Sequence, residues 1–344
     1  MRTAVKNILG ITGSWIPLVF VRYVTKFRDI LPFYHVVSDG DMPHVKHFYR
    51  VKSVEQFIRD LDYLLSKYEP VSMTDWYEYS TGRKMLAKPV MVLSFDDGLK
   101  EIHDIIVPVL AEKGIPATFF INPSFIDNKR LFYKYKASLI IDRLEKHKYP
   151  ASLLEVISSR LDISLRNKDS LKQALLNVKY NDEEFLEIVA ELVEVDFETF
   201  LKIRQPYCSL KQLLNIRGQG FEFGSHSMDH PLFSSLSYEE QLLQVKDSIQ
   251  WIRENLEQDN RFFSFPFTDE GVHSHFFDRL YSDEDPLVDM SFGTAGIKRD
   301  PCPFHFQRIP MDVTRTGARI FIKGEYLYCL FKSLVGRNVI RRKS

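Results

Sequence analysis

The chain has 344 residues, 44% of them hydrophobic, and its 46 Lys and Arg residues balance its 46 Asp and Glu residues. This composition is typical of a globular protein with an ample core and excludes disordered and fibrous proteins. The net charge of zero does not favour nucleic-acid binding, which relies on clustered Lys and Arg. Three widely separated cysteines, Cys208, Cys302 and Cys329, lack CxxC spacing. They therefore predict reduced thiols and a cytoplasmic location rather than disulfides or a thiolate zinc site.

The first 29 residues are expected to form a retained N-terminal segment. Arg2 and Lys6 precede an apolar stretch over 8–21 that resembles a signal peptide, but Gly10, Gly13 and Pro17 interrupt it. The stretch is also shorter than the roughly 20 apolar residues that cross a bilayer. We therefore expect it neither to be cleaved nor to span a membrane.

Short apolar runs alternate with amphipathic stretches along most of the chain, which indicates an α/β protein. Residues 90–95 form a continuous apolar run typical of a buried parallel strand. A helix that ends near Gly114 and a second strand over 117–121 follow it. Further on, the patterns predict a helix over 210–217, a strand over 221–223, a helix over 237–257 that opens with a Ser237–Glu240 capping box, and strands over 261–265 and 287–292.

Residues 128–209 differ from their surroundings, because apolar residues recur there at spacings of three and four with charged residues between them. We interpret this segment as a helical insertion. It leaves from the end of the strand at 117–121, so we expect it to overhang the active site as a lid. The alternative is a buttress packed against the side of the domain.

Residues 316–344 are expected to form a C-terminal helix followed by a basic tail. An apolar, aromatic stretch over 326–340 is accompanied by Arg337, Arg341, Arg342 and Lys343. We favour a packed last helix with a solvated tail. The alternative is a peripheral contact of the termini with an anionic membrane, which would make the protein membrane-associated.

Two clusters of chemically active residues each follow a predicted strand. Asp96 and Asp97 come directly after the first strand, and His226 and His230 follow the strand at 221–223. Parallel α/β proteins place their active sites at such strand ends. One carboxylate and two imidazoles make a three-ligand set with open positions for a divalent metal and a water, and the other carboxylate is then free to act as a general base.

These residues also carry a resemblance to the polysaccharide deacetylases with the NodB homology domain, carbohydrate esterase family 4. Residues 94–98 (SFDDG) and 226–231 (HSMDHP) resemble the first two motifs of that family, and 33–37 (FYHVV) and 114–120 (GIPATFF) are similar to two of its other segments. The resemblance covers 30–127 and 210–315. It implies a distorted (β/α) barrel, a metal held by Asp97, His226 and His230, and a base at Asp96.

The third family motif departs from the common pattern, because Ser264 stands where an arginine that pairs with the base is usual. Residues 263–267 and 308–311 are instead similar to a second branch with FAYP and RIxV segments. We therefore expect Arg308 to supply the missing charge and to lie on the substrate side of the site. The resemblance also implies that the backbone N–H of Phe267 binds substrate by helping to hold the oxyanion. His305 is the expected general acid, with His35 and His273 as rivals.

The resemblance implies a hydrolase that removes an N-acetyl or other N-acyl group from an amino sugar of a polysaccharide or glycolipid precursor. Zinc is the default metal, and cobalt, nickel and iron accept the same ligands. The main alternative is a weakened or inactive barrel that binds a carbohydrate or a protein. A non-haem iron oxygenase uses similar ligands but is disfavoured by the α/β pattern.

Overall fold

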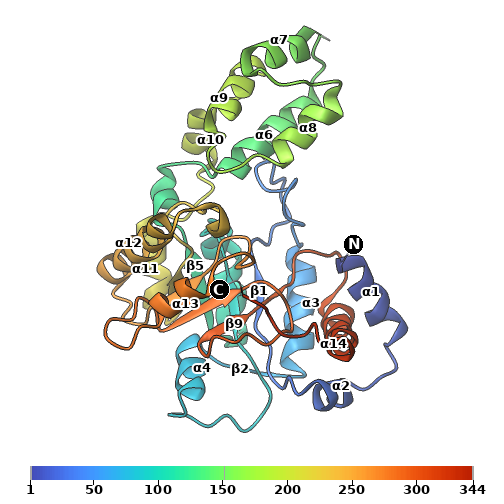
Figure 1. Ribbon diagram of the computed structural model, residues 1–344, viewed down its shortest axis with the longest axis vertical. Coiled ribbons are helices and arrows are strands. Elements are labelled where there is room, and N and C mark those ends of the chain that lie inside the picture. Colours follow the sequence, from blue (N-terminus) through green and yellow to red (C-terminus); the bar gives the residue numbers. More distant parts are fainter. Residues whose placement is uncertain (1, 151, 343–344) are drawn as a thin grey trace.

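The computed structural model describes residues 2–150 and 152–342 (Figure 1). Eight parallel strands form one sheet in the order β10-β1-β4-β5-β6-β7-β8-β9. They comprise β1 (Pro32–Tyr34), β4 (Leu93–Phe95), β5 (Ala117–Ile121), β6 (Glu222–Ser225), β7 (Phe262–Ser264), β8 (Met290–Gly293), β9 (His305–Gln307) and β10 (Ile309–Pro310).

The two edge strands, β9 and β10, are separated only by Arg308. The Arg308 N–H donates to the carbonyl of Gly293 at the end of β8, and the N–H of Ile309 donates to Leu31 beside β1. One segment therefore joins both edges of the sheet. The predicted distorted (β/α) barrel is confirmed.

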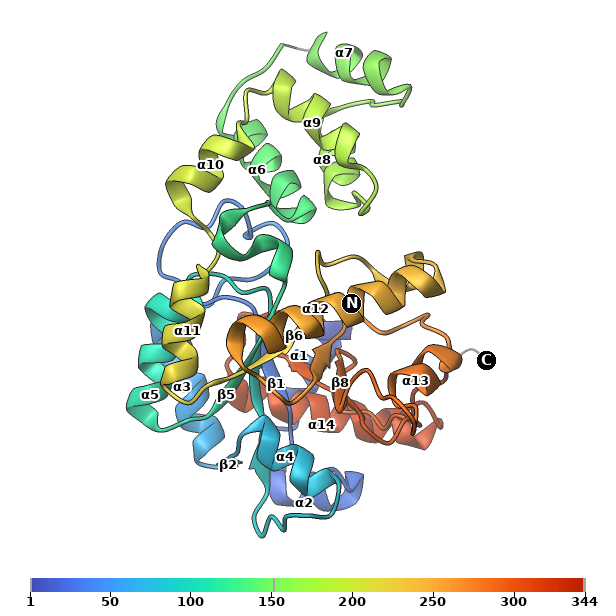
Figure 2. The same ribbon diagram turned by 90° about the vertical axis from the view of Figure 1, so that its left-hand side faces the viewer.

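Helices surround the barrel (Figure 2). They are α3 (Val54–Leu65), α4 (Met73–Ser80), the π-helix η1 (Ile102–Ile106) that continues into α5 (Val107–Lys113), α11 (Leu210–Gly218), α12 (Tyr238–Leu256) and α13 (Ser274–Leu280), with 3₁₀ turns η2 (Pro123–Asn128) and η3 (Phe233–Ser235). The capping box predicted at the start of α12 is present: Ser237 accepts from the Glu240 N–H, and Glu240 accepts from the Ser237 N–H.

The predicted strand over 90–95 is divided in two. Its first half, β3 (Val90–Met91), pairs with β2 (Glu69–Pro70) in a separate two-stranded sheet, and only its second half, β4, joins the barrel. Apolar side chains fill the barrel interior, among them Phe120, Phe262 and Phe292. A second cluster that includes Phe265, Phe276 and Phe277 packs β7 against α12 and α13.

The insertion consists of α6 (Tyr133–Lys146), α7 (Ser152–Leu161), α8 (Lys168–Leu176), α9 (Glu183–Leu192) and α10 (Phe197–Arg204). These helices project from one end of the barrel (Figures 1 and 2). Their core is continuous with barrel residues such as Val36, Leu99 and Phe125.

The two ends of the chain pack against each other. The helices α1 (Arg2–Thr12) and α2 (Leu18–Thr25) both contact α14 (Ala318–Leu334). The last described helix, α14, is therefore packed between other elements of the chain. No helix in the described part of the chain is long and apolar enough to cross a membrane.

Candidate active site

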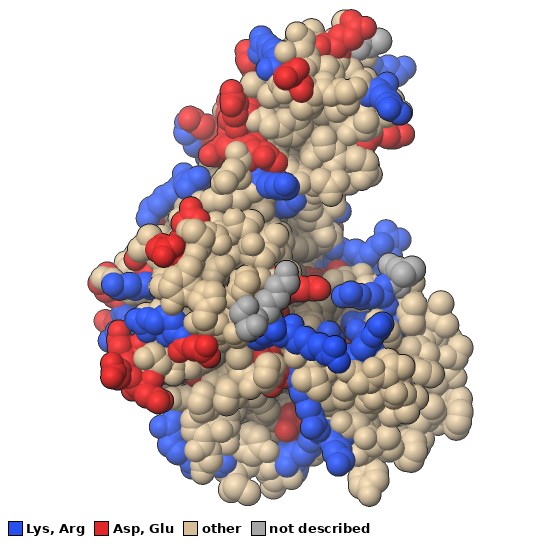
Figure 3. All heavy atoms as spheres, viewed as in Figure 1, with Lys and Arg blue, Asp and Glu red and all other residues tan. Residues whose placement is uncertain are grey.

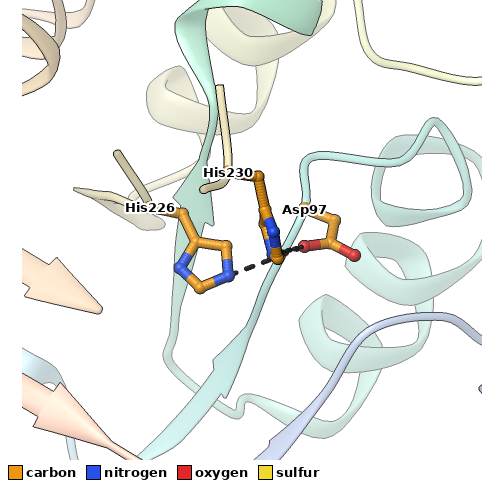
Figure 4. Close-up of side chains that lie close together, drawn as sticks. All are labelled: Asp97, His226 and His230. Atoms are coloured by element: carbon orange, nitrogen blue, oxygen red, sulfur yellow. Dashed lines mark ion pairs between the residues drawn. The ribbon is translucent and has the colours of Figure 1, made fainter. Parts of the chain in front are cut away.

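The predicted metal ligands come together at the carboxyl ends of β4 and β6 (Figure 4). The distance from Asp97 Oδ1 is 3.2 Å to His230 Nε2 and 3.6 Å to His226 Nε2. Ligand atoms about 2.1 Å from a divalent ion lie about 3.0–3.4 Å from one another, so these spacings fit an ion held between them. All three residues are buried.

Unsatisfied polar atoms support the same interpretation. Asp97 Oδ1 and His230 Nε2 are buried without a hydrogen-bond partner in the described residues, although buried polar atoms are normally paired. His226 Nδ1 lies 2.8 Å from the carbonyl oxygen of Ser264. A proton on Nδ1 donates to that carbonyl and leaves the Nε2 lone pair directed at the site. Burial lowers the pKa of His226 to about 4, so the ring is neutral, as a ligand requires.

Two of the three ligands, and two residues next to them, lie on strained backbone. Asp97, Ser227, His230 and Phe267 all have positive φ, between 58° and 75°. Such angles are uncommon in residues other than glycine and tend to cluster at functional sites. At Asp97 the left-handed conformation follows immediately after Asp96, so the two carboxylates leave β4 in different directions.

Asp96 lies beside the Asp-His-His group, with its Oδ2 3.7 Å from His226 Nε2, and pairs with Arg308. The guanidinium donates to Asp96 Oδ1 at 2.8 Å and to Oδ2 at 2.7 Å, and also to the hydroxyls of Ser94 and Ser264. Burial alone raises the pKa of Asp96, but the charge and hydrogen bonds of Arg308, together with His226 and His35, outweigh burial and lower the pKa below the ordinary value. The carboxylate is therefore ionised and carries a fixed counter-charge.

Arg308 was expected on the substrate side of the site, and this expectation needs correction. Its side chain is fully buried, with the guanidinium over the ring of Phe33 at 4.2 Å. It positions Asp96 and does not face open space. The small Ser264 leaves room for it, which explains why a serine fits where an arginine is usual.

The expected general acid, His305, is not among these groups. Its side chain packs against Phe265 and Phe277 on the outer side of the sheet, and its Nδ1 and Nε2 contact Ser291 and Asp269. Strand alternation explains this placement: the next residue, Phe306, packs with the barrel interior, so His305 points outward. His273, the other rival, precedes α13.

His35 is the histidine that accompanies the two carboxylates. It follows β1, and Tyr34 of that strand is in register with Phe95, which places His35 level with Asp96. Asp312 Oδ2 lies 2.8 Å from His35 Nδ1 and also accepts from the His35 backbone N–H. Burial works to lower the pKa of His35, but Asp312 and the nearby Asp97 and Asp96 raise it to about 9.

The insertion contributes directly to the site. The Tyr135 hydroxyl, from α6, donates to Asp97 Oδ2 at 2.7 Å. The ring of Phe132 lies 4.4 Å from the His230 ring, and Phe267 covers another side of that ring at 4.6 Å. Further out, Tyr180 donates to Asp229 at 2.6 Å, in the loop that joins His226 to His230. Neither Tyr135 nor Asp312 gave a signal in the sequence, because both reach the site only through tertiary packing.

A second group, Asp269, Asp300 and His305, also lies within metal-ligand distance. Arg342, from the C-terminal tail, donates to both carboxylates, and Gln307 donates to both as well. A guanidinium therefore supplies the positive charge that a metal would bring, and the oxygens are already occupied. The C-terminal tail, which was predicted to be solvated, is therefore held at Arg342 by Asp269 and Asp300.

The polysaccharide deacetylase family model matches residues 83–275, more than half of the chain. The chain belongs to the polysaccharide deacetylase family. Among solved structures it is similar to the Streptococcus pyogenes deacetylase PplD in complex with acetate, with a TM-score of 0.54 and 13% identity over 86% of this chain and 97% of that one. It is also similar to IcaB from Ammonifex degensii, with a TM-score of 0.53 and 15% identity over 87% and 96% of the two chains.

A de-N-acetylase from Aggregatibacter actinomycetemcomitans gives a TM-score of 0.53 and 14% identity over 86% of this chain and 99% of that chain. No curated protein matches the chain. At these identities the solved structures support the fold alone. The family match and the buried Asp-His-His group together show a polysaccharide deacetylase fold with a group able to hold a metal.

Proposed function

We propose that the protein is a metal-dependent hydrolase that removes an N-acetyl, or other N-acyl, group from an amino sugar of a polysaccharide or glycolipid precursor. The observation that carries the proposal is that two adjacent carboxylates have different partners. Asp97 faces two histidines, whereas Asp96 is held in its ionised state by Arg308. A binding module has no need for this second, ionised carboxylate beside a metal-ligand set.

In this proposal Asp97, His226 and His230 hold one divalent ion, with zinc as the default and cobalt, nickel or iron as alternatives. The ion, when bound, polarises the amide carbonyl and lowers the pKa of a water. Tyr135 fixes the orientation of the Asp97 carboxylate through its second oxygen. Such contacts behind a ligand tune the affinity for the metal.

Asp96 acts as the general base and takes a proton from the attacking water. Its low pKa keeps it ionised across the neutral range, and Arg308 holds both its oxygens in one orientation. Arg308 comes from the 308–311 segment, which supports placing the protein in the FAYP/RIxV-like branch of the family.

The backbone N–H of Phe267 is proposed to bind the oxyanion. Phe267 has a φ of 58° and its N–H has no acceptor within residues 2–150 and 152–342. Its ring lies 4.6 Å from the His230 ring, which puts this residue beside a metal ligand. An unpaired donor held by unfavourable backbone geometry is what an oxyanion site requires.

His35 replaces His305 as the proposed general acid, which protonates the leaving amine. Asp312 holds Nδ1 and leaves Nε2 free to donate, and a pKa of about 9 keeps the ring protonated at neutral pH. The ring is further fixed by Tyr49, which stacks on it at 4.0 Å.

The test is acetate release from N-acetylglucosamine oligomers by protein that has been stripped with a chelator and reloaded with zinc, cobalt, nickel or iron. We expect release only after reloading, and release at least about a hundredfold slower from Asp96→Asn. Stoichiometric metal without acetate release from this panel or from N-acetylated glycolipids would favour the binding module instead.

A further inference from the structure

The two ends of the chain carry a concentrated positive charge in an otherwise neutral protein. Residues 1–28 and 326–344 contain no Asp or Glu, yet each contains five basic residues: Arg2, Lys6, Arg22, Lys26 and Arg28 in the first, and Lys332, Arg337, Arg341, Arg342 and Lys343 in the second. Because α1 and α2 pack on α14, Arg2, Arg22 and Lys332 lie on one side of the barrel, whereas Lys6 is paired with Glu325 and Arg342 with Asp269 and Asp300.

One face of α1 is fixed tightly to α14. A Cβ at Gly10 would lie 2.1 Å from the carbonyl oxygen of Ile320, and one at Gly324 would lie 2.0 Å from that of Lys6, so the two backbones touch. Lys6 also pairs with the buried Glu325. The opposite face of α1 is therefore held outward and cannot turn to bury its side chains.

That outward face and the following helix α2 are apolar. We define the α1–α2 surface as the exposed large apolar side chains of 2–25: Val5, Ile8, Ile11, Trp15, Val19, Phe20, Tyr23 and Val24. Trp15 is 80% exposed, Val19 72% and Tyr23 82%. Soluble proteins rarely expose so many large apolar residues in succession. Figure 3 shows this side of the molecule as a broad area without acidic residues, bordered by basic ones.

A groove of about 510 Å³ adjoins this surface. It is lined by an apolar edge from α2 and by four cationic side chains, with no carboxylate: Pro17, Leu18, Val19, Arg22, Tyr63, Ser66, Lys67, Arg319 and Lys323. Cations at the rim of an apolar surface match a lipid phosphate above its acyl chains.

We propose that the α1–α2 surface docks the protein on an anionic lipid bilayer, with the apolar side chains in the interfacial region and the groove cations on lipid phosphates. Charge favours this occupant over a second copy of the chain, because two copies face to face would bring their basic residues together. Trp15 and Tyr23 are also of the types that concentrate at the membrane–water interface. The proposal does not depend on the hydrolase activity.

The test is co-sedimentation of the full chain with phosphatidylcholine–phosphatidylglycerol vesicles and with phosphatidylcholine vesicles. We expect binding to the anionic vesicles, weakened by salt, and a blue shift of Trp15 fluorescence that Trp15→Ala removes. The pairs Ile11→Glu with Val19→Glu and Lys67→Glu with Arg319→Glu should each weaken binding at least about tenfold.

The control is Ile203→Glu on α10, since Ile203 is 74% exposed but lies in the insertion. It should bind vesicles like the unmodified protein. Circular dichroism and the unfolding temperature establish that each variant is folded. Equal binding by the α1–α2 variants and the control, or a stable dimer in light scattering that Ile11→Glu with Val19→Glu converts to monomer, would overturn the proposal.

Discussion

Replacement of Arg308 by methionine tests how Asp96 is kept ionised. The change removes two charge-assisted hydrogen bonds, of 2.8 and 2.7 Å, to a carboxylate that is almost fully buried. Loss of one partner of a buried ion pair costs about 3–5 kcal/mol of folding free energy. Without the guanidinium, burial raises the pKa of Asp96, and the acidic limb of the pH–rate profile moves to higher pH because only the ionised form is a base.

Urea unfolding and acetate release as a function of pH measure the two effects. Arg342→Met is the matched control, because Arg342 is also a nearly buried guanidinium that bonds two carboxylates, Asp269 and Asp300, away from the metal ligands. It should lose stability but keep the acidic limb in place. Ser264→Arg added to Arg308→Met should restore part of the activity. An unchanged acidic limb in Arg308→Met would refute our account of Asp96.

Four further predictions concern single side chains of the site. His226→Ala should abolish stoichiometric metal binding, measured by elemental analysis, with the barrel intact by circular dichroism. Asp96→Asn should retain the metal but lose at least about a hundredfold in turnover, and loss of the metal would show that this carboxylate is a ligand. Asp312→Asn should lower the pKa of His35 from about 9 and so shift the alkaline limb of the activity profile to lower pH, since the acid must be protonated; an unmoved limb would contradict the pairing. Tyr135→Phe should weaken metal affinity about 10–100-fold in a chelator competition, and unchanged affinity would show that the hydroxyl is not needed.

The barrel and the Asp-His-His group were predictable because their signals are local. The strand over 117–121 is found at its predicted bounds, and both motifs directly follow strands that adjoin β5 in the sheet. The sequence did not predict that residues 90–95 form two strands in two different sheets. The point of division depends on the partner strands, which are β2 for the first half and β1 and β5 for the second. The periodicity of apolar residues shows which side chains are buried, but it does not show which strand pairs with which.

The general acid shows a different limit. His305 and His35 both lie in or next to short strands, and the sequence does not reveal which side of a two- or three-residue strand faces the barrel interior. If the strand is shifted by one residue, every side chain moves to the opposite face of the sheet. His35, however, directly follows β1, just as Asp96 directly follows the neighbouring strand β4. That parallel between two strand ends was a usable signal for choosing between the two histidines.

The insertion is neither a simple lid nor a buttress, because its parts differ in their relation to the metal ligands. Its helix α6 is buried on most sides and binds Asp97 through Tyr135, so a movement of α6 breaks a hydrogen bond to a charged group, worth about 1.5–3 kcal/mol, together with packing. The loop that carries Tyr180 is only half-buried and contacts Asp229, which is not a ligand. Movement of this loop leaves the three ligands in place. Substrate access on the Tyr180 side is therefore compatible with a stably bound metal, whereas access by displacement of α6 is coupled to loosening of Asp97.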